Sequence, residues 1–404
     1  MNPVTTPAPG MRLYYLDDVG VLFSQATQEL HLLNPTAAVI WSLLEEGNDE
    51  PAIVDALRGT YGLDEATSRQ FASAALAEWR DKGFLGEVAS APEDVEKPPP
   101  ARAPVEGPPW PGPAAHEVRR YRILGSHFTL RFSSEAQVHV VHPVLDHLET
   151  NAEPSAATPT QVDVVEASGN LLVYRDRELF AASAGIDALA PIVKSLVWTT
   201  AVRDQRFFLN IHAGVVSDGS RCILLPAAPG SGKSTLTAAL VHAGYEFFSD
   251  EVALLEDRTL DVFPVPLALC VKDSGIEALA DRFPQLRSLA IHRRGDGKRV
   301  AYMPPPARSR PASEAARPVG ALIFPRFAPG GGTSFAPLSR SEALQRLMTE
   351  CIGVSETLDT NRVEALVRWI ARIPCYALTH GSTDDAIAAV ASVFPGPRHS
   401  GLAA

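Results

Sequence analysis

A glycine-rich loop between an apolar strand and a helix constrains the fold of this chain more than any other stretch. Residues 221–226 have the pattern of a buried strand, residues 227–234 read Ala-Ala-Pro-Gly-Ser-Gly-Lys-Ser, and a helical pattern follows to Gly244. A small residue, four others and then Gly-Lys-Ser is the relaxed form of the phosphate-loop motif, and strand, loop and helix in this order are the context that it needs. The sequence therefore predicts an α/β phosphate-loop domain here.

The residue types in this loop suit a nucleoside triphosphate and Mg²⁺. Glycines let consecutive backbone amides curl around the β-phosphate, a lysine reaches the β- and γ-oxygens, and a serine hydroxyl coordinates Mg²⁺. The helix that begins here also directs its positive end at the anion. We expect ATP and Mg²⁺ as cofactors, bound by the loop residues Ala227, Gly230, Ser231, Gly232, Lys233, Ser234 and Thr235.

Two adjacent acids follow the next apolar strand. The stretch "YEFFSDEVALL" ends its strand at Asp250 and Glu251, and "NIHAGVVSDG" places His212 one hairpin before the loop. One acid beside a triphosphate can hold the metal and another can take a proton from an acceptor hydroxyl. We expect Asp250, Glu251, His212 and Lys233 to be catalytic, and Ser234, Asp250 and Glu251 to be the metal ligands; which acid has which role stays open.

A proline-rich segment marks the clearest boundary in the chain. Residues 87–115 carry prolines at high density, which removes amide donors and restricts φ, so we expect an extended, semi-rigid linker. It separates a module at residues 11–86 from a domain at residues 116–404. The expected fold class combines an α+β module with an α/β domain.

The first module has the pattern of a small meander followed by three helices. Residues 12–18 and 20–33 are β-rich runs with turn residues between them, and helices are predicted from Pro35 to Gly47, from Pro51 to Gly62 and from Asp64 to Gly83. The third helix is expected to turn Phe71, Ala75, Leu76 and Trp79 inward. The arrangement is winged-helix-like, but five Lys/Arg against twelve Asp/Glu in residues 11–86 argue against contacts with nucleic-acid phosphates.

This module resembles the PqqD family of peptide-recognition elements. The likeness lies in the hairpin, "LLNPTAAVIWSLLEEG", "DALRGTYGLD" and "LAEWRDKGFLG". The resemblance implies that residues 11–86 capture the leader of a ribosomally synthesised precursor peptide as an added strand beside the last helix.

The second domain resembles the HPr kinase/phosphorylase family, of the type shared with phosphoenolpyruvate carboxykinase, and most of all the HPr-kinase-related branch found beside PqqD-type modules. The likeness rests on the loop, His212, the paired acids, "CVKDSGIEALADRFPQL", "KRVAYMPPP" and "ALIFPRFAPGG". It implies that Lys272, Arg299 and Arg326 approach the phosphates. Thr235 stands where authentic HPr kinases usually carry Glu, which predicts an acceptor other than HPr. Residues 121–195 are expected to be a β-rich lead-in that completes this domain.

Composition limits the partners. The formal charge of −11 argues against binding to nucleic acid or to an anionic membrane, and the four cysteines form no C-x-x-C pair. The start of the sequence lacks the pattern of a signal peptide, so we expect a cytoplasmic protein. The expected partners are the leader peptide and other peptide-modifying enzymes; self-association stays open.

The sequence-based hypothesis is an ATP-dependent kinase that phosphorylates a hydroxyl, of Ser or Thr, on a precursor peptide held by the first module. Two alternatives stay open. One is a kinase for a small molecule or a carboxylate, with the first module regulatory, and the other is a non-catalytic, ATP-gated peptide chaperone. Acids beside the loop favour catalysis, because a switch needs a metal site but no general base.

Overall fold

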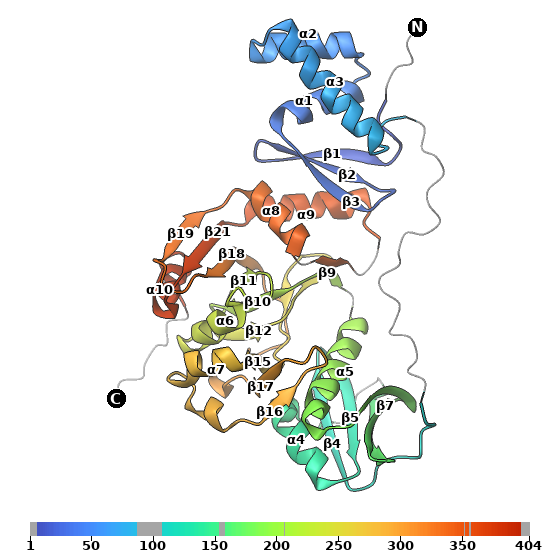
Figure 1. Ribbon diagram of the computed structural model, residues 1–404, viewed down its shortest axis with the longest axis vertical. Helices are drawn as coiled ribbons and strands as arrows, with labels where there is room; N and C mark the ends of the chain where they lie inside the picture. Colours follow the sequence, from blue (N-terminus) through green and yellow to red (C-terminus); the bar gives the residue numbers. More distant parts are fainter. Residues whose placement is uncertain are drawn as a thin grey trace. The chain divides into compact units, whose positions relative to one another are not determined.

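The chain divides into two compact units in the computed structural model (Figure 1), which describes residues 6–86, 107–152, 158–205, 207–350, 352–354 and 357–396. The first unit comprises residues 1–98, 338–348 and 356–374, and the second comprises residues 99–337, 349–355 and 375–404. Residues 87–106 of the predicted linker lie outside the described residues. None of the helices in the described parts is long and apolar enough to cross a membrane.

The first unit begins with the predicted meander and three helices. β1 (Met11–Leu16), β2 (Val19–Ser24) and β3 (Glu29–Leu33) form an antiparallel sheet, and α1 (Pro35–Glu45), α2 (Glu50–Tyr61) and α3 (Glu65–Asp81) follow. Each helix begins after a side chain that accepts a backbone N–H, which satisfies a free donor of its first turn; these residues are Asn34, Asp49 and Asp64. The Trp41 and Trp79 rings meet edge to face, 5.0 Å apart, in the core.

One helix of this module has a different phase from the predicted one. Ser68, Ala72, Leu76 and Trp79 form the buried stripe of α3, whereas Phe71 is 43% exposed. The prediction that Phe71 points inward is wrong, because the 4-4-3 spacing of the buried positions turns residue 71 onto the neighbouring stripe.

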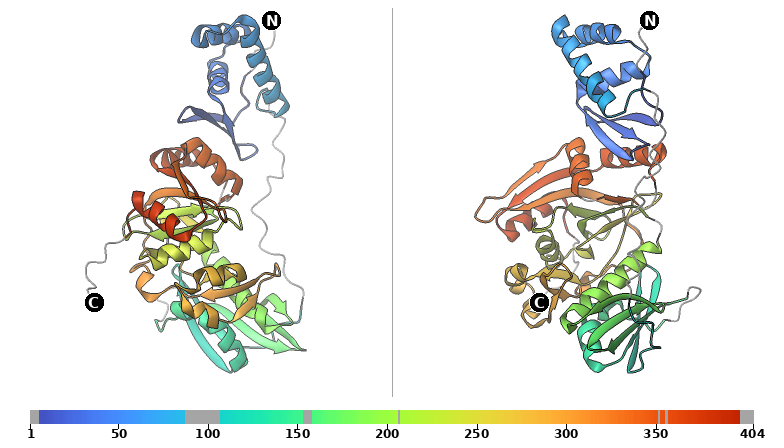
Figure 2. Two further views of the ribbon diagram at one scale, coloured as in Figure 1. Left: turned by 60° about the vertical axis from the view of Figure 1, so that its left-hand side comes forward. Right: turned by 45° about the vertical axis from the view of Figure 1, so that its right-hand side comes forward.

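Two helices from late in the sequence complete the same unit. α8 (Arg340–Glu350) and α9 (Thr360–Arg372) run along the side of the sheet that α1–α3 leave open (Figures 1 and 2). Val21 and Phe23 alternate with Leu22 along β2 and are fully buried, yet only Leu22 belongs to the core shared with α1–α3. The central strand β2 is therefore buried on both faces.

Hydrogen bonds fix this helix pair to both turns of the sheet. The Arg340 backbone N–H donates to Asp17 Oδ2 (2.8 Å) beside the β1–β2 turn. At the β2–β3 turn, the Gln28 side chain accepts from Leu358 N (2.6 Å) and donates to Leu358 O (3.1 Å). The unit boundaries thus differ from the predicted domains, since residues 338–348 and 356–374 group with the first module rather than with residues 116–404.

The second unit opens with a five-stranded sheet and two helices, where the sequence indicated a β-rich lead-in. Its strands are β4 (Glu117–Ile123), β5 (Ser126–Phe132), β6 (Thr160–Ala167), β7 (Asn170–Arg175) and β8 (Glu178–Ser183), and its helices are α4 (Glu135–Leu145) and α5 (Leu189–Arg203). Trp110 Nε1 and Ala114 N both donate to the buried Asp163 carboxylate on β6, at 3.0 Å each. The described end of the proline-rich segment is therefore attached to this sheet and is not a free spacer.

Three further sheets surround the phosphate loop. The largest has the order β12 (Glu246–Ser249), β10 (Ala213–Ser217), β11 (Cys222–Pro226), β18 (Val319–Phe327), β21 (Cys375–His380), β19 (Ser334–Pro337). The second joins β14 (Val262–Phe263), β13 (Ala253–Glu256), β9 (Phe207–Ile211) and β20 (Ile352–Val354), and the third joins β15 (Leu269–Lys272), β17 (Arg299–Met303) and β16 (Ile291–Arg293). The remaining helices of the unit are α6 (Lys233–His242), α7 (Asp273–Ala280) and α10 (Thr383–Val393).

The parallel core of the largest sheet positions the loop. β11 pairs with β18 and β18 with β21 in parallel register, so their carboxyl ends meet at one edge. The phosphate loop follows β11 at that edge. In open α/β sheets this edge is where ligands bind.

A discontinuous first unit predicts that its N-terminal fragment is incomplete. We expect residues 1–98 alone to expose the apolar face of β2, to bind a hydrophobic dye and to unfold without a cooperative transition, because Val21 and Phe23 lose their cover. Residues 1–98 joined by a Gly/Ser linker to residues 338–374 should unfold cooperatively in urea, followed by circular dichroism. Equal cooperativity of both fragments would contradict the assignment of α8 and α9 to this unit.

Candidate functional site

The phosphate loop owes its shape to two glycines in left-handed conformations. Gly230 has φ 98° and Gly232 has φ 89°, a region that other residues rarely adopt. A Cβ on Gly232 would also lie 3.0 Å from Phe327 Cβ. The chain can therefore pass close to β18 and begin α6 directly at Lys233, where free backbone amides and the positive helix end face the cavity.

A third glycine seats the helix on the sheet. A Cβ on Gly214 of β10 would lie 2.2 Å from Thr237 Oγ1 and 3.4 Å from Lys233 Cγ. The Thr237 hydroxyl donates to the Lys233 carbonyl at 2.9 Å. The first turn of α6 thus lies directly against β10, which fixes where the Lys233 side chain starts.

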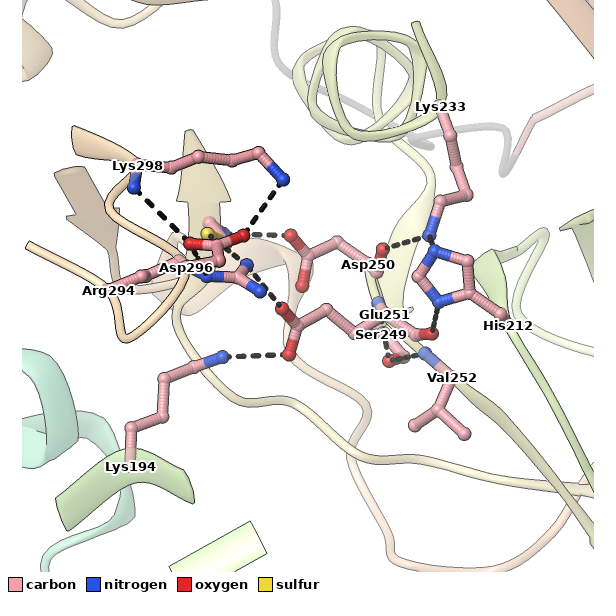
Figure 3. Close-up of polar contacts among 11 residues, drawn as sticks. Lys194, His212, Lys233, Ser249, Asp250, Glu251, Val252, Arg294, Asp296 and Lys298 are labelled. Carbon is pink, nitrogen blue, oxygen red and sulfur yellow. Dashed lines mark hydrogen bonds and ion pairs between the residues drawn. The ribbon is translucent and has the colours of Figure 1, made fainter. Parts of the chain in front are cut away.

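Lys233 is buried and its ammonium is held between two elements (Figure 3). Nζ lies 3.1 Å from His212 Nε2 and donates to the Asp250 carbonyl at 3.1 Å. His212 Nδ1 lies 2.9 Å from the Glu251 carbonyl, which can only accept, so Nδ1 carries the proton and Nε2 accepts from Lys233. Burial and the Lys233 charge lower the pKa of His212, which favours this neutral ring.

The two adjacent acids occupy different environments. The Asp250 side chain is buried and accepts the Cys270 N–H at 2.8 Å, and burial together with the Glu251 charge raises the pKa of Asp250 to about 6. Glu251 forms an ion pair with Lys194 (3.1 Å), and the pKa of Glu251 is lowered by that ammonium in spite of burial. Two carboxyl groups whose pKa values are driven apart can serve as base and as fixed charge.

Three cations of the site were missed in the sequence. Lys194 projects from α5, and its ammonium lies 5.1 Å from the Tyr302 ring centre. Arg294 lies 3.7 Å from Glu251 Oε1, and Lys298 forms an ion pair with Asp296 at 2.8 Å (Figure 3). A single lysine in the apolar run "LAPIVKSLVWTTAV" was the available signal for the first of them.

These groups surround one cavity of about 350 Å³. Its lining contains most of the predicted site, namely His212, Gly230, Gly232, Lys233, Ser234, Thr235, Asp250, Glu251 and Lys272, and it adds Cys270, Arg294, Lys298, Phe327, His380 and Thr383 among others. The structure thus brings together the predicted catalytic residues and most of the predicted binding residues.

Four predicted binding residues lie outside this lining as the structure describes it. Ala227 is buried behind the loop, and Ser231 accepts the Phe327 N–H through its carbonyl (2.9 Å). Arg299 pairs with Asp273 at 3.1 Å, and Arg326 is exposed on β18. In the cavity, the positions expected for Arg299 and Arg326 are taken by Arg294 and Lys298.

The oxygen donors present fit a magnesium ion bound together with phosphates. The Ser234 hydroxyl and the Asp250 carboxylate line the same cavity, whereas the described residues contain no cluster of three His, Cys, Asp or Glu side chains that could hold a metal by themselves. Mg²⁺ commonly takes one or two protein oxygens and completes its shell with substrate phosphates and water. Glu251 is held by Lys194 and Arg294, and Asp250 accepts the Cys270 N–H, which leaves the Ser234 hydroxyl as the better placed protein ligand.

Comparison with known proteins identifies part of the first unit. The family described as coenzyme PQQ synthesis protein D (PqqD) matches residues 20–85, so the chain contains a PqqD-type domain. Among solved structures, "TbiB1 in Complex with the TbiA(beta) Leader Peptide" is 30% identical, covers 20% of this chain and 93% of that chain, and has a TM-score of 0.19. No curated protein matches the chain.

The raised pKa of Asp250 predicts that this residue reduces stability at neutral pH. When the pKa of a carboxyl is higher in the folded state, the group does not lower the free energy of unfolding at pH values below its unfolded pKa near 4. It destabilises the fold as the pH rises through about 6. We expect Asp250→Asn to raise the free energy of unfolding by about 1–3 kcal/mol at pH 8, and to change it little at pH 4.

Urea denaturation at the two pH values measures this difference. Asp281→Asn replaces a fully exposed carboxyl on the same domain and serves as the control, with an expected change below about 0.5 kcal/mol. Equal stability of Asp250→Asn and the wild type at pH 8 would show that the buried carboxyl is not destabilised by its surroundings.

Proposed function

We propose that this chain is an ATP-dependent kinase that phosphorylates a hydroxyl group, of Ser or Thr, on a ribosomally synthesised peptide whose leader binds the PqqD-type domain. The observation that carries the proposal is the meeting of a phosphate-loop lysine and a buried carboxyl of raised pKa in one cavity. Lys233 and Asp250 both line this cavity, and the Lys233 ammonium donates a hydrogen bond to the Asp250 backbone carbonyl.

Binding of the triphosphate follows from the loop. The amides at the start of α6 and the Lys233 ammonium are donors for the β- and γ-phosphates, and the cavity adds the cations Lys272, Arg294 and Lys298. Bound Mg²⁺ would neutralise charge on the phosphates, with the Ser234 hydroxyl as its protein ligand. His212 holds the Lys233 ammonium through Nε2 and thereby fixes where its positive charge lies.

Asp250 is the group best suited to take the proton from the hydroxyl group that receives the phosphate. In the transfer, the hydroxyl oxygen forms a bond to the γ-phosphorus while the bond from that phosphorus to the bridging oxygen breaks, and ADP leaves with the electron pair. The hydroxyl proton passes to the Asp250 carboxylate. A pKa of about 6 keeps Asp250 ionised at neutral pH and close to the range in which a base is most effective.

The PqqD-type domain supplies a surface for an extended peptide. Within the described residues β3 pairs with β2 alone, so its outer edge can accept an added strand. The His31 ring on β3 lies 4.7 Å from the Phe84 ring, which follows the end of α3, and α3 itself carries the exposed Phe71. An exposed phenylalanine on a helix that ends beside the sheet edge is a natural anchor for an apolar leader residue.

A leader held by one end raises the effective concentration of the rest of its peptide at the kinase site, up to about millimolar for a suitable span. This gives a physical reason for a peptide-binding domain and a phosphate-loop domain in one chain. A small-molecule kinase would gain nothing from it.

Lys233→Ala should remove phosphoryl transfer, because the ammonium stabilises charge that grows on the transferring group. We expect a loss of at least about 10²–10³-fold in kcat, measured with labelled ATP and precursor peptide and located by mass spectrometry. Arg258→Ala, an exposed cation outside the cavity, is the control. Unchanged transfer by Lys233→Ala would remove the loop from the reaction, and phosphate found only on a small molecule would favour the alternative kinase.

Phe71→Ser should weaken leader binding, since Phe71 is an exposed apolar side chain on α3, the helix that ends beside the proposed peptide edge. We expect about tenfold weaker binding by calorimetry, from a wild-type dissociation constant of about micromolar. Tyr61→Ser removes an aromatic ring of similar exposure, 41% against 43%, from the end of α2 and should leave the affinity unchanged. Equal losses in both variants would place the leader elsewhere.

A further inference from the structure

One wall of the cavity has no part in the phosphate chemistry described so far. It consists of Phe327 at the end of β18, His380 at the end of β21 and Thr383 at the start of α10. β18 and β21 are parallel, and Phe327 and His380 are paired in their register. Both side chains therefore stand at the edge of the sheet where the phosphate loop also begins.

His380 presents a buried nitrogen that lacks a partner. The residue is 2% exposed, and no atom of the described chain hydrogen-bonds to its Nε2. Its Nδ1 lies 3.2 Å from the Ser382 carbonyl, so Nδ1 carries the proton and Nε2 of the neutral ring is an acceptor. Burial lowers the pKa of His380, which agrees with a neutral ring. A buried acceptor of this kind requires a donor, and because His380 lines the cavity, a ligand bound there can supply one.

Phe327 joins this wall directly to the phosphate loop. Its backbone N–H donates to the Ser231 carbonyl at 2.9 Å, and its Cβ lies against Gly232. The ring is 44% exposed and its centre is 5.5 Å from that of His380. A large apolar ring left this exposed at a cavity wall can stack on a flat ligand.

We propose that Phe327 and His380 bind the nucleoside end of the nucleotide, with the base against the Phe327 ring and an amino group of the base donating to His380 Nε2. This inference rests on the proposed role of the loop as a triphosphate site. The 6-amino group of adenine is such a donor, whereas a guanine or uracil base bound in the same orientation would turn the lone pairs of its 6-oxo or 4-oxo group toward the nitrogen. Cytosine offers an amino group but a smaller ring for stacking. The wall therefore selects adenine.

Calorimetry on the full-length chain with Mg²⁺ tests this selection through binding alone. The probes are the non-hydrolysable imido analogues of ATP, GTP and purine riboside triphosphate, which lacks only the 6-amino group. We expect the ATP analogue to bind the wild type about tenfold more tightly than the other two, the usual size of one neutral hydrogen bond.

Variants assign the selection to the two side chains. His380→Leu should bind the ATP and purine riboside analogues equally, and His380→Gln, which keeps an acceptor, should retain part of the preference. Phe327→Leu should weaken the binding of both analogues by a similar factor. Because Phe327 is exposed, this variant should fold even if His380→Leu does not. A wild type that binds the two analogues equally, or an unchanged preference in a folded His380→Leu, would overturn the inference.

Two further results separate this inference from the proposed function. If Lys233→Ala loses binding of every analogue while the His380 variants behave as wild type, the triphosphate site stands and only the base site is wrong. If Lys233→Ala binds the analogues as the wild type does, both fail. The 2′-deoxy form of the ATP analogue tests the alternative that His380 faces the ribose. If removal of the 2′-hydroxyl weakens binding and removal of the 6-amino group does not, that alternative holds and the assignment is overturned.

Discussion

The ion pair between Lys194 and Glu251 determines how the two adjacent acids divide their roles. Without a nearby cation, two neighbouring buried carboxylates repel each other, and the pKa of one of them would be strongly raised. Lys194 stabilises charge on Glu251, and Asp250 is left with the pKa near 6 that suits a base. The lysine comes from α5, whose apolar side packs in one cluster with Val252 and Leu254 directly after the acids. The five-stranded lead-in and its helix are therefore part of the candidate site, because α5 carries the charge that distinguishes the acids.

The cavity has a charge opposite to that of the whole chain. Its lining contains the cations Lys233, Lys272, Arg294 and Lys298 against the carboxylates Asp250 and Glu251, whereas the chain carries a formal charge of −11. Such a local excess of positive charge is favourable only when an anion with several charges neutralises it. In the proposed function, the burial of Lys233 and Asp250 prepares the site for a triphosphate at the expense of stability, a trade that is common where function requires desolvated charge.

The predicted site residues that the structure brings into one cavity are mostly encoded within one short stretch. His212, Lys233 and Asp250 flank three consecutive strands of a known loop pattern, so their proximity follows from the motif. The cations were missed because their placement depends on tertiary contacts. Arg299 stands opposite Arg293 in the register of β16 and β17 and forms an ion pair with Asp273. Arg294, at the turn of the same hairpin, forms an ion pair with Glu251. Phe71 was assigned to the wrong face of α3, because the packing of Leu76 and Trp79 sets which face of this helix is buried. The grouping of α8 and α9 with β1–β3 has no local signal, since it joins segments far apart in the chain.

That grouping has a consequence for the order in which the protein forms during synthesis. The sheet β1–β3 and helices α1–α3 are complete by residue 81, but the helices that cover the other face of the sheet begin only at Arg340. At about 5–20 residues per second the ribosome needs on the order of tens of seconds to make the intervening chain. Throughout that interval Val21 and Phe23 have no native cover, and the nascent chain presents an apolar sheet face to its surroundings. The PqqD-type domain, although it precedes the other unit in the sequence, is among the last parts of the protein to reach its final form.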